Sequence, residues 1–488
     1  MQPIEMTLYW RERQEQQKTP ETQERMSLKN KKIKHGHAGN TGAENNELFA
    51  SMPVAQAILM LAVPTVVSQI ITIIYNMADT FFIGQLGDPK QVAAATLAMP
   101  LFMFMTALSN LFGVGGASLI SRFLGAKERD QARRCSAFCI WSAAAVSFLY
   151  GVLVLAGRPV LMPLLGANEE TFQMASSYLF WTIGLGALPT VLNPALAHLI
   201  RAEGYSRQAS FGVAFGGILN MVLDPLFIYG FHLQITGAAI ATLISNTTAL
   251  LYFVGFIWKI RKNSVLTLSP RYYTLGNHIP AEVVSVGLPS FLISMMGTVS
   301  NMVLNHIIAG YSNVAVAGMG IAKKVNMLAF AVAQGITQGT LPLIGYNYSS
   351  GDRKRMLEAI RTLFVFSLGV ALFIAVMLYL NAPAVTRLFI NNEETVSYGC
   401  SFLHIICSAS PMTAMTFFAL TVFQATGKKK QPIILSMLRK GTVDVPFMFL
   451  FNAMFGIGGV AWATPVAEVT SMVVAAVMVI PYIRKLGR

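Results

Sequence analysis

Long apolar runs recur along the chain at the length that crosses a lipid bilayer. A membrane-spanning helix needs roughly 20 predominantly apolar residues to cross about 30 Å of hydrocarbon. Twelve such runs occur, near residues 57–84, 92–121, 135–156, 172–200, 208–230, 235–257, 281–309, 314–345, 359–381, 396–424, 432–452 and 457–481. The pattern predicts an all-α membrane protein of twelve transmembrane helices.

An internal repeat divides these spans into two sets of six. The segment PVLMPLLGANEET at 159–171 matches PAVTRLFINNEET at 383–395, and Pro64 pairs with Pro289 in nearly the same register. Two halves with an even number of spans are related by an axis along the membrane normal, so we expect two pseudo-symmetric six-helix bundles. The expected parts are a cytoplasmic disordered tail at 1–50, an N-terminal lobe at 51–262, a cytoplasmic linker at 263–280 and a C-terminal lobe at 281–488.

Composition supports a lipid environment. Hydrophobic residues make up 54% of the chain and charged residues 12%, whereas soluble proteins average about 25% charged residues. The mean hydropathy is +0.55. The first 50 residues are the exception, because they are polar and charged and lack the apolar stretch of a signal peptide. The first membrane helix is therefore expected to be retained.

The net charge of +14 is a signal of topology. Twenty-one Lys and Arg residues lie in the loops after the even-numbered spans and at the C-terminal end, against three in the opposite loops. Basic residues concentrate on the cytoplasmic side of membrane proteins. Both termini are thus expected in the cytoplasm, with the cell membrane as the location, the lipid bilayer as a partner and no nucleic-acid partner.

Buried carboxylates are the main candidate functional groups in the first half. A charge at the centre of a membrane helix costs about 2.5 to 3.5 kcal/mol, yet Asp79 lies within the first span and Asp224 within the fifth. Asn76 and Asn220 precede them at helical spacing, and Thr242 on the sixth span adds a hydroxyl. Such a cluster suits a proton or a sodium ion, and we favour the proton. Alternatively, these groups only hydrogen-bond helices together.

The second half lacks the same carboxylates at the aligned positions. Leu304 aligns with Asp79 and Val445 with Asp224, so the ion site is expected to be asymmetric. This half instead carries charged residues of both signs, which form either a second-lobe cavity or an ion-paired lock between helices: Lys323, Lys324, Arg439, Lys440, Asp444 and Glu468, of which Lys323, Arg439 and Asp444 are the candidates for the cavity. A P-loop and an HExxH motif are both missing, so neither an enzyme nor a bound cofactor is expected.

Several motifs resemble those of the bacterial multidrug and toxic compound extrusion (MATE) transporters. They are YNMADTFFIGQLG (75–87), SRFLGAKERDQA (121–132), IRAEGYSRQA (200–209), NMVLDPLFIY (220–229) and GAAIATLIS (237–245). The resemblance implies an antiporter that exports amphipathic, often cationic, compounds in exchange for protons or sodium. It places the family's first-lobe ion site on Asp79, Asn220, Asp224 and Thr242. One branch of the family has acidic residues on its seventh and tenth helices, and this chain has none inside those spans.

The sequence is also compatible with other functions. A flippase for lipid-linked or peptide precursors has a similar fold and would favour a basic cavity, as Lys323, Lys324, Arg439 and Lys440 could provide. An intramembrane enzyme or receptor is disfavoured by the missing nucleophile–base pair and metal cluster. Small-molecule substrates and a monomeric state are expected.

Overall fold

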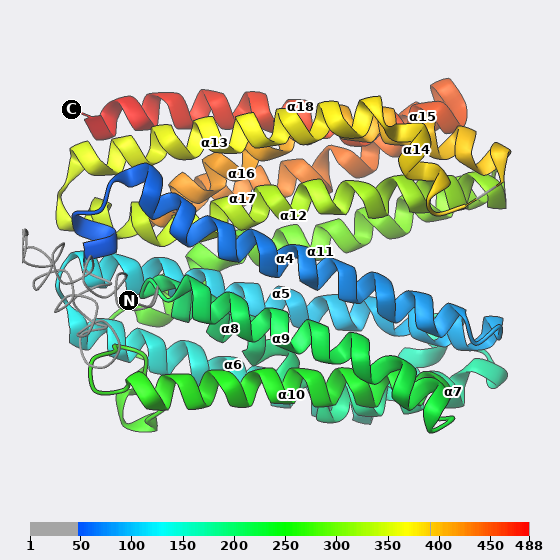
Figure 1. The fold of residues 1–488 in the computed structure, drawn as a ribbon, viewed down its shortest axis with the longest axis horizontal. Helices are drawn as coiled ribbons and strands as arrows, with labels where there is room; N and C mark the ends of the chain where they lie inside the picture. The colour runs from blue at the N-terminus through cyan, green and yellow to red at the C-terminus, as the bar shows by residue number, and fades with distance from the viewer. Residues whose placement is uncertain (1–46, 391, 488) are drawn as a thin grey trace, which may run out of the picture. The chain divides into compact units, whose positions relative to one another are not determined.

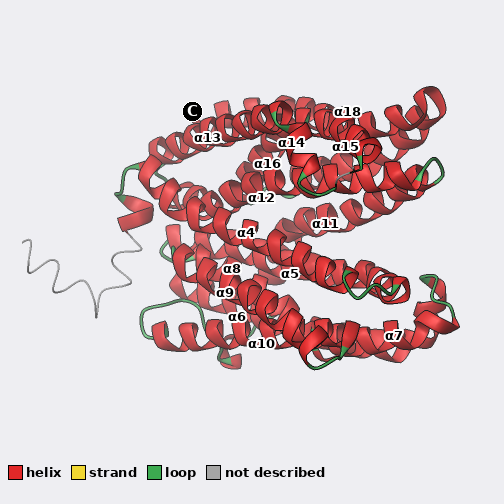
Figure 2. Cartoon of the chain, turned by 45° about the vertical axis from the view of Figure 1, so that its right-hand side comes forward, coloured by secondary structure: helices red, strands yellow, loops and turns green. Residues whose placement is uncertain are grey.

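The computed structural model describes residues 47–390 and 392–487, and every regular element in these ranges is helical (Figure 2). The described residues from Leu48 onward form one compact unit. The tail predicted at 1–50 falls almost entirely outside the described residues. Figure 1 shows the long helices of the unit running side by side along its longest axis.

The first half consists of six spans followed by a linker. Its elements are α4 (Val54–Gly84), α5 (Pro89–Gly125), α6 (Arg129–Leu164), α7 (Glu169–Leu179) with the π turn η1 (Phe180–Leu185) and α8 (Ala187–Ala202), α9 (Ser206–Pro225) with the π turn η2 (Leu226–Gly230), and α10 (Gln234–Ile260). The linker contains the 3-10 turn η3 (Pro270–Tyr272). Glu203 anchors this linker, because its buried carboxylate accepts hydrogen bonds from the Ser264 hydroxyl and from the Val265 amide at 2.6 Å. Burial raises the pKa of Glu203 above its ordinary value.

The second half repeats this plan with more breaks. Its elements are α11 (Ile279–Ala309), α12 (Asn313–Ser350), α13 (Arg353–Leu380), α14 (Ala382–Arg387), α15 (Glu393–Ser408), α16 (Ser410–Ala425), α17 (Lys430–Met437), the π turn η4 (Leu438–Thr442) and α18 (Asp444–Gly487). The repeated Asn-Glu-Glu-Thr segments mark the same helix start in each half. Asn168 accepts a hydrogen bond from the Thr171 amide and Asn392 from the Thr395 amide, both at 2.9 Å, which satisfies an otherwise unpaired N–H of the first turn.

The number of spans follows from length and from two breaks. Ten helices in the described ranges are long and apolar enough to cross a membrane, and the pair α7–η1 and α8, bent by 49°, makes an eleventh. The continuous segment Lys430–Gly487 has 58 residues, about 87 Å of helix, which is enough for two crossings. Gly456 interrupts it at φ 62° and ψ −148°. With that break the twelve predicted spans are accounted for.

The two halves pack through α5 against α11 and α4 against α12. Small residues permit the close approach. A Cβ at Gly287 would lie 1.9 Å from the Leu111 carbonyl oxygen, and one at Gly115 would lie 2.2 Å from the Val283 carbonyl oxygen. The helix backbones are therefore in direct contact at these glycines, so this arrangement of the halves depends on their missing side chains.

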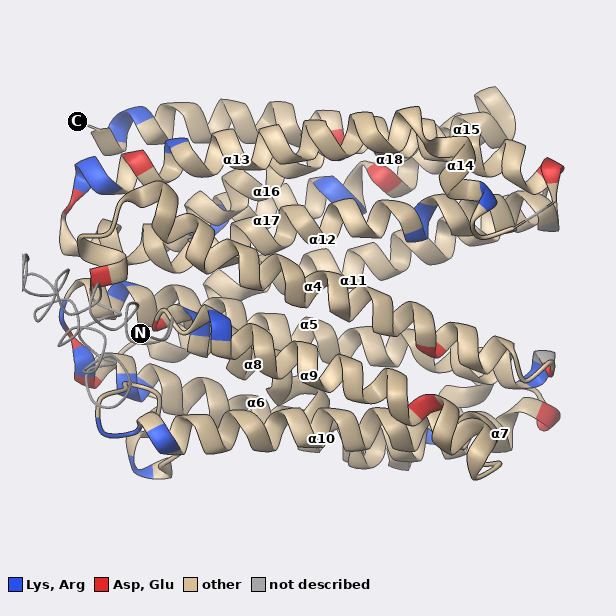
Figure 3. Ribbon diagram, in the orientation of Figure 1, with Lys and Arg blue, Asp and Glu red and all other residues tan. Residues whose placement is uncertain are grey.

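Polar contacts between the halves lie toward one end of the bundle. Figure 3 shows most Lys and Arg residues at the end where the C terminus lies. Near that end, Glu282 on α11 pairs with Arg122 on α5 at 3.3 Å and with Lys429 at 2.5 Å. Deeper in the bundle, Asn110 donates to Ser294 at 3.1 Å. Helices α4 and α12 are joined there as well, because Gln69 donates to Gln338 at 3.0 Å.

Candidate functional site

The first-half candidates come together where α4, α9 and α10 pack. Asp224 is fully buried and Asn220 is 2% exposed, whereas Asp79 and Thr242 are half-buried. Asp224 directly precedes Pro225, which has no N–H to donate to the preceding turn. The π turn η2 follows at once. The carboxylate is therefore held next to a break in regular α-helix, where departures from the regular ladder often accompany functional sites.

Hydrogen bonds join three of the predicted residues. The Asn220 amide nitrogen donates to Asp224 Oδ1 at 3.1 Å and approaches Thr242 Oγ1 at 3.5 Å. Asp79 lies close enough to Asp224 for their charges to interact. The structure thus brings Asp79, Asn220, Asp224 and Thr242 into one cluster.

The cluster has more hydrogen-bond acceptors than donors. Asp79 Oδ1, Asn220 Oδ1 and Asp224 Oδ2 are all buried, and none of the three accepts a hydrogen bond from the described residues. A buried acceptor without a partner is unfavourable, and two neighbouring carboxylates carry like charges in a medium that screens them poorly. A cation or a proton would relieve both problems. The oxygen atoms of the cluster suit a hard cation.

Asn76 does not belong to this cluster. Its side chain is exposed, and its amide donates to the Thr72 carbonyl of its own helix at 2.8 Å. Two tyrosines that the sequence analysis did not name, Tyr75 and Tyr178, lie within electrostatic reach of the two carboxylates. The spacing of Tyr75, four residues before Asp79, could have revealed it. Tyr178 on α7 has no comparable sequence signal.

The second half holds a buried counterpart of this arrangement. Asp444 is fully buried and accepts hydrogen bonds from Ser300 at 2.6 Å and from Thr464 at 3.2 Å. The Lys440 ammonium lies 3.4 Å from its Oδ2. The sequence alignment opposed Val445 to Asp224, whereas in the structure Asp444 has the corresponding contacts. The alignment paired Pro225 with Pro446, and one additional residue, Val445, separates Asp444 from its proline, whereas Asp224 directly precedes Pro225.

An ion pair lies beside Asp444. The Arg439 Nε donates to both oxygens of Glu468, at 2.8 and 3.0 Å, and both side chains are buried. The guanidinium carbon lies 4.4 Å from the ring centre of Phe417. Lys323 lies at the edge of this group, where its ammonium donates to Asn301 Oδ1 at 2.9 Å. The structure thus contains the ion pair between helices that the sequence suggested. The possible cavity formed by Lys323, Arg439 and Asp444 stays a prediction.

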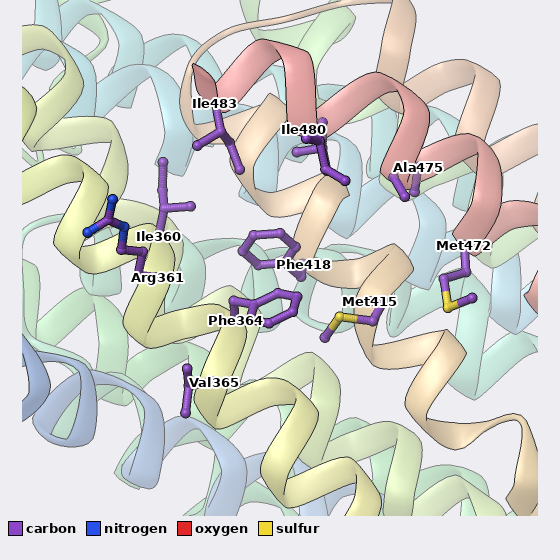
Figure 4. A pocket seen from close by; sticks show the side chains of 12 residues that line it. Ile360, Arg361, Phe364, Val365, Met415, Phe418, Met472, Ala475, Ile480 and Ile483 are labelled. Atoms are coloured by element: carbon purple, nitrogen blue, oxygen red, sulfur yellow. The ribbon is translucent and has the colours of Figure 1, made fainter. Parts of the chain in front are cut away.

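A separate apolar cavity of about 520 Å³ lies among α13, α16 and α18 (Figure 4). Apolar side chains such as Phe364, Phe418 and Met472 line it, and Arg361 is its single charged lining residue. None of the candidate site residues contributes to it. Exposed apolar surface on these spans suits contact with lipid tails, so the carboxylate cluster remains the candidate functional site.

The MatE family model matches residues 64–226 and again residues 289–450, once in each half. The multidrug export protein MepA of Staphylococcus saprophyticus is 30% identical to this chain over 436 residues, which are 89% of this chain and 95% of that protein. The chain belongs to the MATE family. MepA of Staphylococcus aureus strain MRSA252 shows the same identity over 437 residues, with the same coverage.

Solved MATE structures share the fold of this transporter. A MATE protein in complex with MaL6 superposes with a TM-score of 0.85 at 24% identity, covering 91% of this chain and 98% of that chain. A mutant of the Vibrio cholerae MATE transporter VcmN superposes with a TM-score of 0.82 at 21% identity, covering 92% of this chain and 99% of that chain. The predicted family and the all-α membrane fold are thus confirmed, and the chain is a multi-pass membrane transporter rather than an enzyme.

Proposed function

We propose that this MATE transporter is a secondary antiporter that exports amphipathic, cationic drugs in exchange for protons. The observation that carries the proposal is the set of three unpaired acceptor oxygens on Asp79, Asn220 and Asp224. The multidrug export proteins of similar sequence support the substrate class. No other cofactor is required, because the ion gradient supplies the free energy.

The cluster would couple the two fluxes by competition. Two carboxylates within electrostatic reach of each other resist simultaneous ionisation at a poorly hydrated site. Either a proton or a cationic substrate relieves that repulsion, so binding of one opposes binding of the other. Sodium is the alternative coupling ion, because Asn220 and Thr242 add neutral oxygen atoms that can coordinate it.

Transport by alternating access follows from the need to keep the gradient. A site open to both sides at once would let the ion leak, so one side must close before the other opens. The polar contacts between the halves, such as Glu282 with Arg122, lie toward the end rich in basic residues. We take this end as cytoplasmic by the positive-inside rule. In this proposal both termini face the cytoplasm, the cell membrane is the location, and the transporter acts as a monomer.

The decisive experiment separates the two gradients. Liposomes that contain the purified transporter are loaded with a fluorescent monovalent cation. Efflux of this cation is followed with a pH gradient alone, a sodium gradient alone, or neither. We expect efflux with the pH gradient, and none in the Asp224→Asn variant, because the amide is nearly isosteric but does not release a proton near neutral pH. Asp130→Asn is the matched control, since Asp130 is exposed and, among the described residues, pairs only with Arg134 on its own helix.

Two outcomes would overturn parts of the proposal. Efflux that persists without the pH gradient and stops without sodium would show that sodium is the coupling ion. Normal gradient-driven efflux by the Asp224→Asn variant, at equal protein content, would remove Asp224 from the ion site.

A flippase is the second candidate function, favoured by the cations Lys323, Arg439 and Lys440 in the second half. An anionic lipid headgroup would be attracted to that charge. Liposomes containing a fluorescent polyprenyl phosphate distinguish the two functions. Movement of this lipid between leaflets, without efflux of the cationic dye, would support the flippase.

A further inference from the structure

The two halves of the chain build the same polar arrangement from equivalent helices. The segment GAAIAT before and including Thr242 matches GVAWAT before and including Thr464. Thr464 donates to the fully buried Asp444, and Thr242 lies 3.5 Å from the Asn220 amide that donates to the fully buried Asp224. The second half therefore retains the aspartate and threonine of the candidate ion site.

One residue of the arrangement differs in charge. Four residues before each aspartate, on the same helix, the first half has Asn220 and the second has Lys440. Asn220 donates to Asp224 Oδ1 at 3.1 Å but leaves the other oxygen, Oδ2, without a donor. The Lys440 ammonium lies 3.4 Å from Asp444 Oδ2, which also accepts from Ser300.

The hydrogen-bond balance of the two aspartates therefore differs. Both oxygens of Asp444 have donors, because Thr464 donates to Oδ1 and Ser300 and Lys440 reach Oδ2. In the first half, three acceptor oxygens lack a donor among the described residues. In the first half, a mobile cation would bind beside the unpaired aspartate oxygen. In the second half, the Lys440 ammonium lies at the corresponding position.

We propose that the second half contains a second cation-binding site that is permanently occupied by the ammonium group of Lys440. Asp444, Thr464 and Ser300 form this site. Without the Lys440 side chain, it would bind a proton or a small monovalent cation. The site neither loads nor releases an ion during transport, so coupling is confined to the first half.

The charges around Asp444 agree with this assignment. Three cations, Lys323, Arg439 and Lys440, lie within the group, against the two carboxylates of Asp444 and Glu468. Arg439 is already bound in a bidentate contact to Glu468. Lys323 donates a hydrogen bond to Asn301. Its charge interacts with those of Lys440 and Asp444, but Lys323 forms no ion pair with a carboxylate among the described residues. Lys440 is consequently the cation in direct contact with Asp444.

The inference rests on the proposed ion site of the first half, and its test is built to separate the two. Cation binding is measured on the full chain in detergent, by proton uptake on mild acidification and by binding of radioactive sodium at fixed pH. Three variants are compared with the wild type. The single variant carries Asp224→Asn, the double variant carries Asp224→Asn and Lys440→Asn, and the triple variant adds Asp444→Asn to the double variant. Lys440→Asn places in the second half the residue that Asn220 provides in the first.

We expect Asp224→Asn to lose the wild-type cation and the double variant to regain one, with the regained cation lost again in the triple variant. A double variant that folds like the wild type yet binds no more than Asp224→Asn overturns the inference. If Lys440→Asn fails to fold, Lys440→Gln with Asp224→Asn replaces it, because the longer amide still reaches Asp444. If the wild type and the Asp224→Asn variant bind the same amount of cation, the proposed ion site of the first half is wrong. The comparison of the double with the triple variant still tests the site of the second half.

Discussion

Neighbouring residues on one turn of α4 have different surroundings, and only one of the two lies in the candidate ion cluster. Asn76 and Asp79 are separated by three positions, so sequence spacing places them on one face. In the structure the Asn76 amide is bound to the Thr72 carbonyl, whereas Asp79 Oδ1 is buried without a donor in the described residues. An asparagine hydrogen-bonded to its own helix is satisfied locally, and a buried unpaired carboxylate oxygen is not.

This contrast gives a prediction with its own control on the same helix. Asp79→Asn should reduce gradient-driven efflux to the level of protein-free liposomes, because it removes one of the two charges that the coupling ion balances. Asn76→Ala should leave efflux nearly unchanged. The measurement is dye efflux at matched reconstitution, and a loss of function in both variants, or in Asn76→Ala alone, would contradict the assignment.

The buried pair of Arg439 and Glu468 allows a prediction about stability. Arg439→Met leaves the Glu468 carboxylate buried, with Lys440 at 3.9 Å as its one remaining cation in the described part of the chain. Breaking such a pair costs about 3–5 kcal/mol. Arg439→Met with Glu468→Leu removes both charges and should recover most of that loss. Thermal unfolding in detergent measures both variants. A double variant no more stable than Arg439→Met would show that the arginine acts through its packing on Phe417 rather than through its charge.

At the scale of the elements, the length of the apolar runs and the internal repeat predicted most of the architecture. Run length alone located the spans, and Asn168 and Asn392, as matching helix caps, marked equivalent helices. The π turns could not be predicted, because no residue type signals them. The alignment of the two halves was also one residue out at the second aspartate, because Val445 is an additional residue between Asp444 and Pro446. Asp444, rather than Val445, has the contacts that correspond to those of Asp224.

Helix α11 carries two glycines that differ in what surrounds them. Gly287→Ala would place a Cβ 1.9 Å from the Leu111 carbonyl oxygen, while Gly297 has nothing within 4 Å. We expect Gly287→Ala to push α5 from α11 and to lower thermal stability. Gly297→Ala should be neutral or stabilise by about 0.5–1 kcal/mol, because alanine loses less conformational entropy in a helix. Equal unfolding temperatures for the two variants would mean that the close contact at Gly287 is not maintained in the membrane protein.

At the scale of the whole unit, the contacts between the halves are concentrated on one side of the ion cluster. Every hydrogen bond and ion pair that links α4 or α5 to α11 or α12 in the described residues lies between the helix middles and the basic end. A small polar cavity of about 40 Å³ remains there, lined in part by Asn110, Ser294 and Gln338. This distribution supports a state that is closed toward the basic end, which we propose is cytoplasmic.

The Glu282 carboxylate should therefore control how often that end opens. It contacts Arg122 of the first half and Lys429 of the second, so it is shared between the two halves. Glu282→Gln removes both charge attractions, while backbone contacts such as that at Gly287 remain. We expect the closed state to become less populated rather than lost. The effect should shrink at high salt, because the three side chains are partly exposed and their charges are screened.

The population of the open state can be read from a cysteine placed at Ser294, which faces Asn110 across the two halves. The native cysteines, Cys135, Cys139, Cys400 and Cys407, are first replaced by alanine. A membrane-impermeant maleimide is then applied from either side of oriented vesicles. Glu282→Gln should speed labelling from the basic-loop side and slow it from the opposite side, because the two openings exclude each other. Glu358→Gln, a change at an exposed carboxylate on α13, is the control and should alter neither rate. Faster labelling from both sides at once in the Glu282 variant would mean that the halves separate without alternating, since a single rocking motion must close one side as it opens the other.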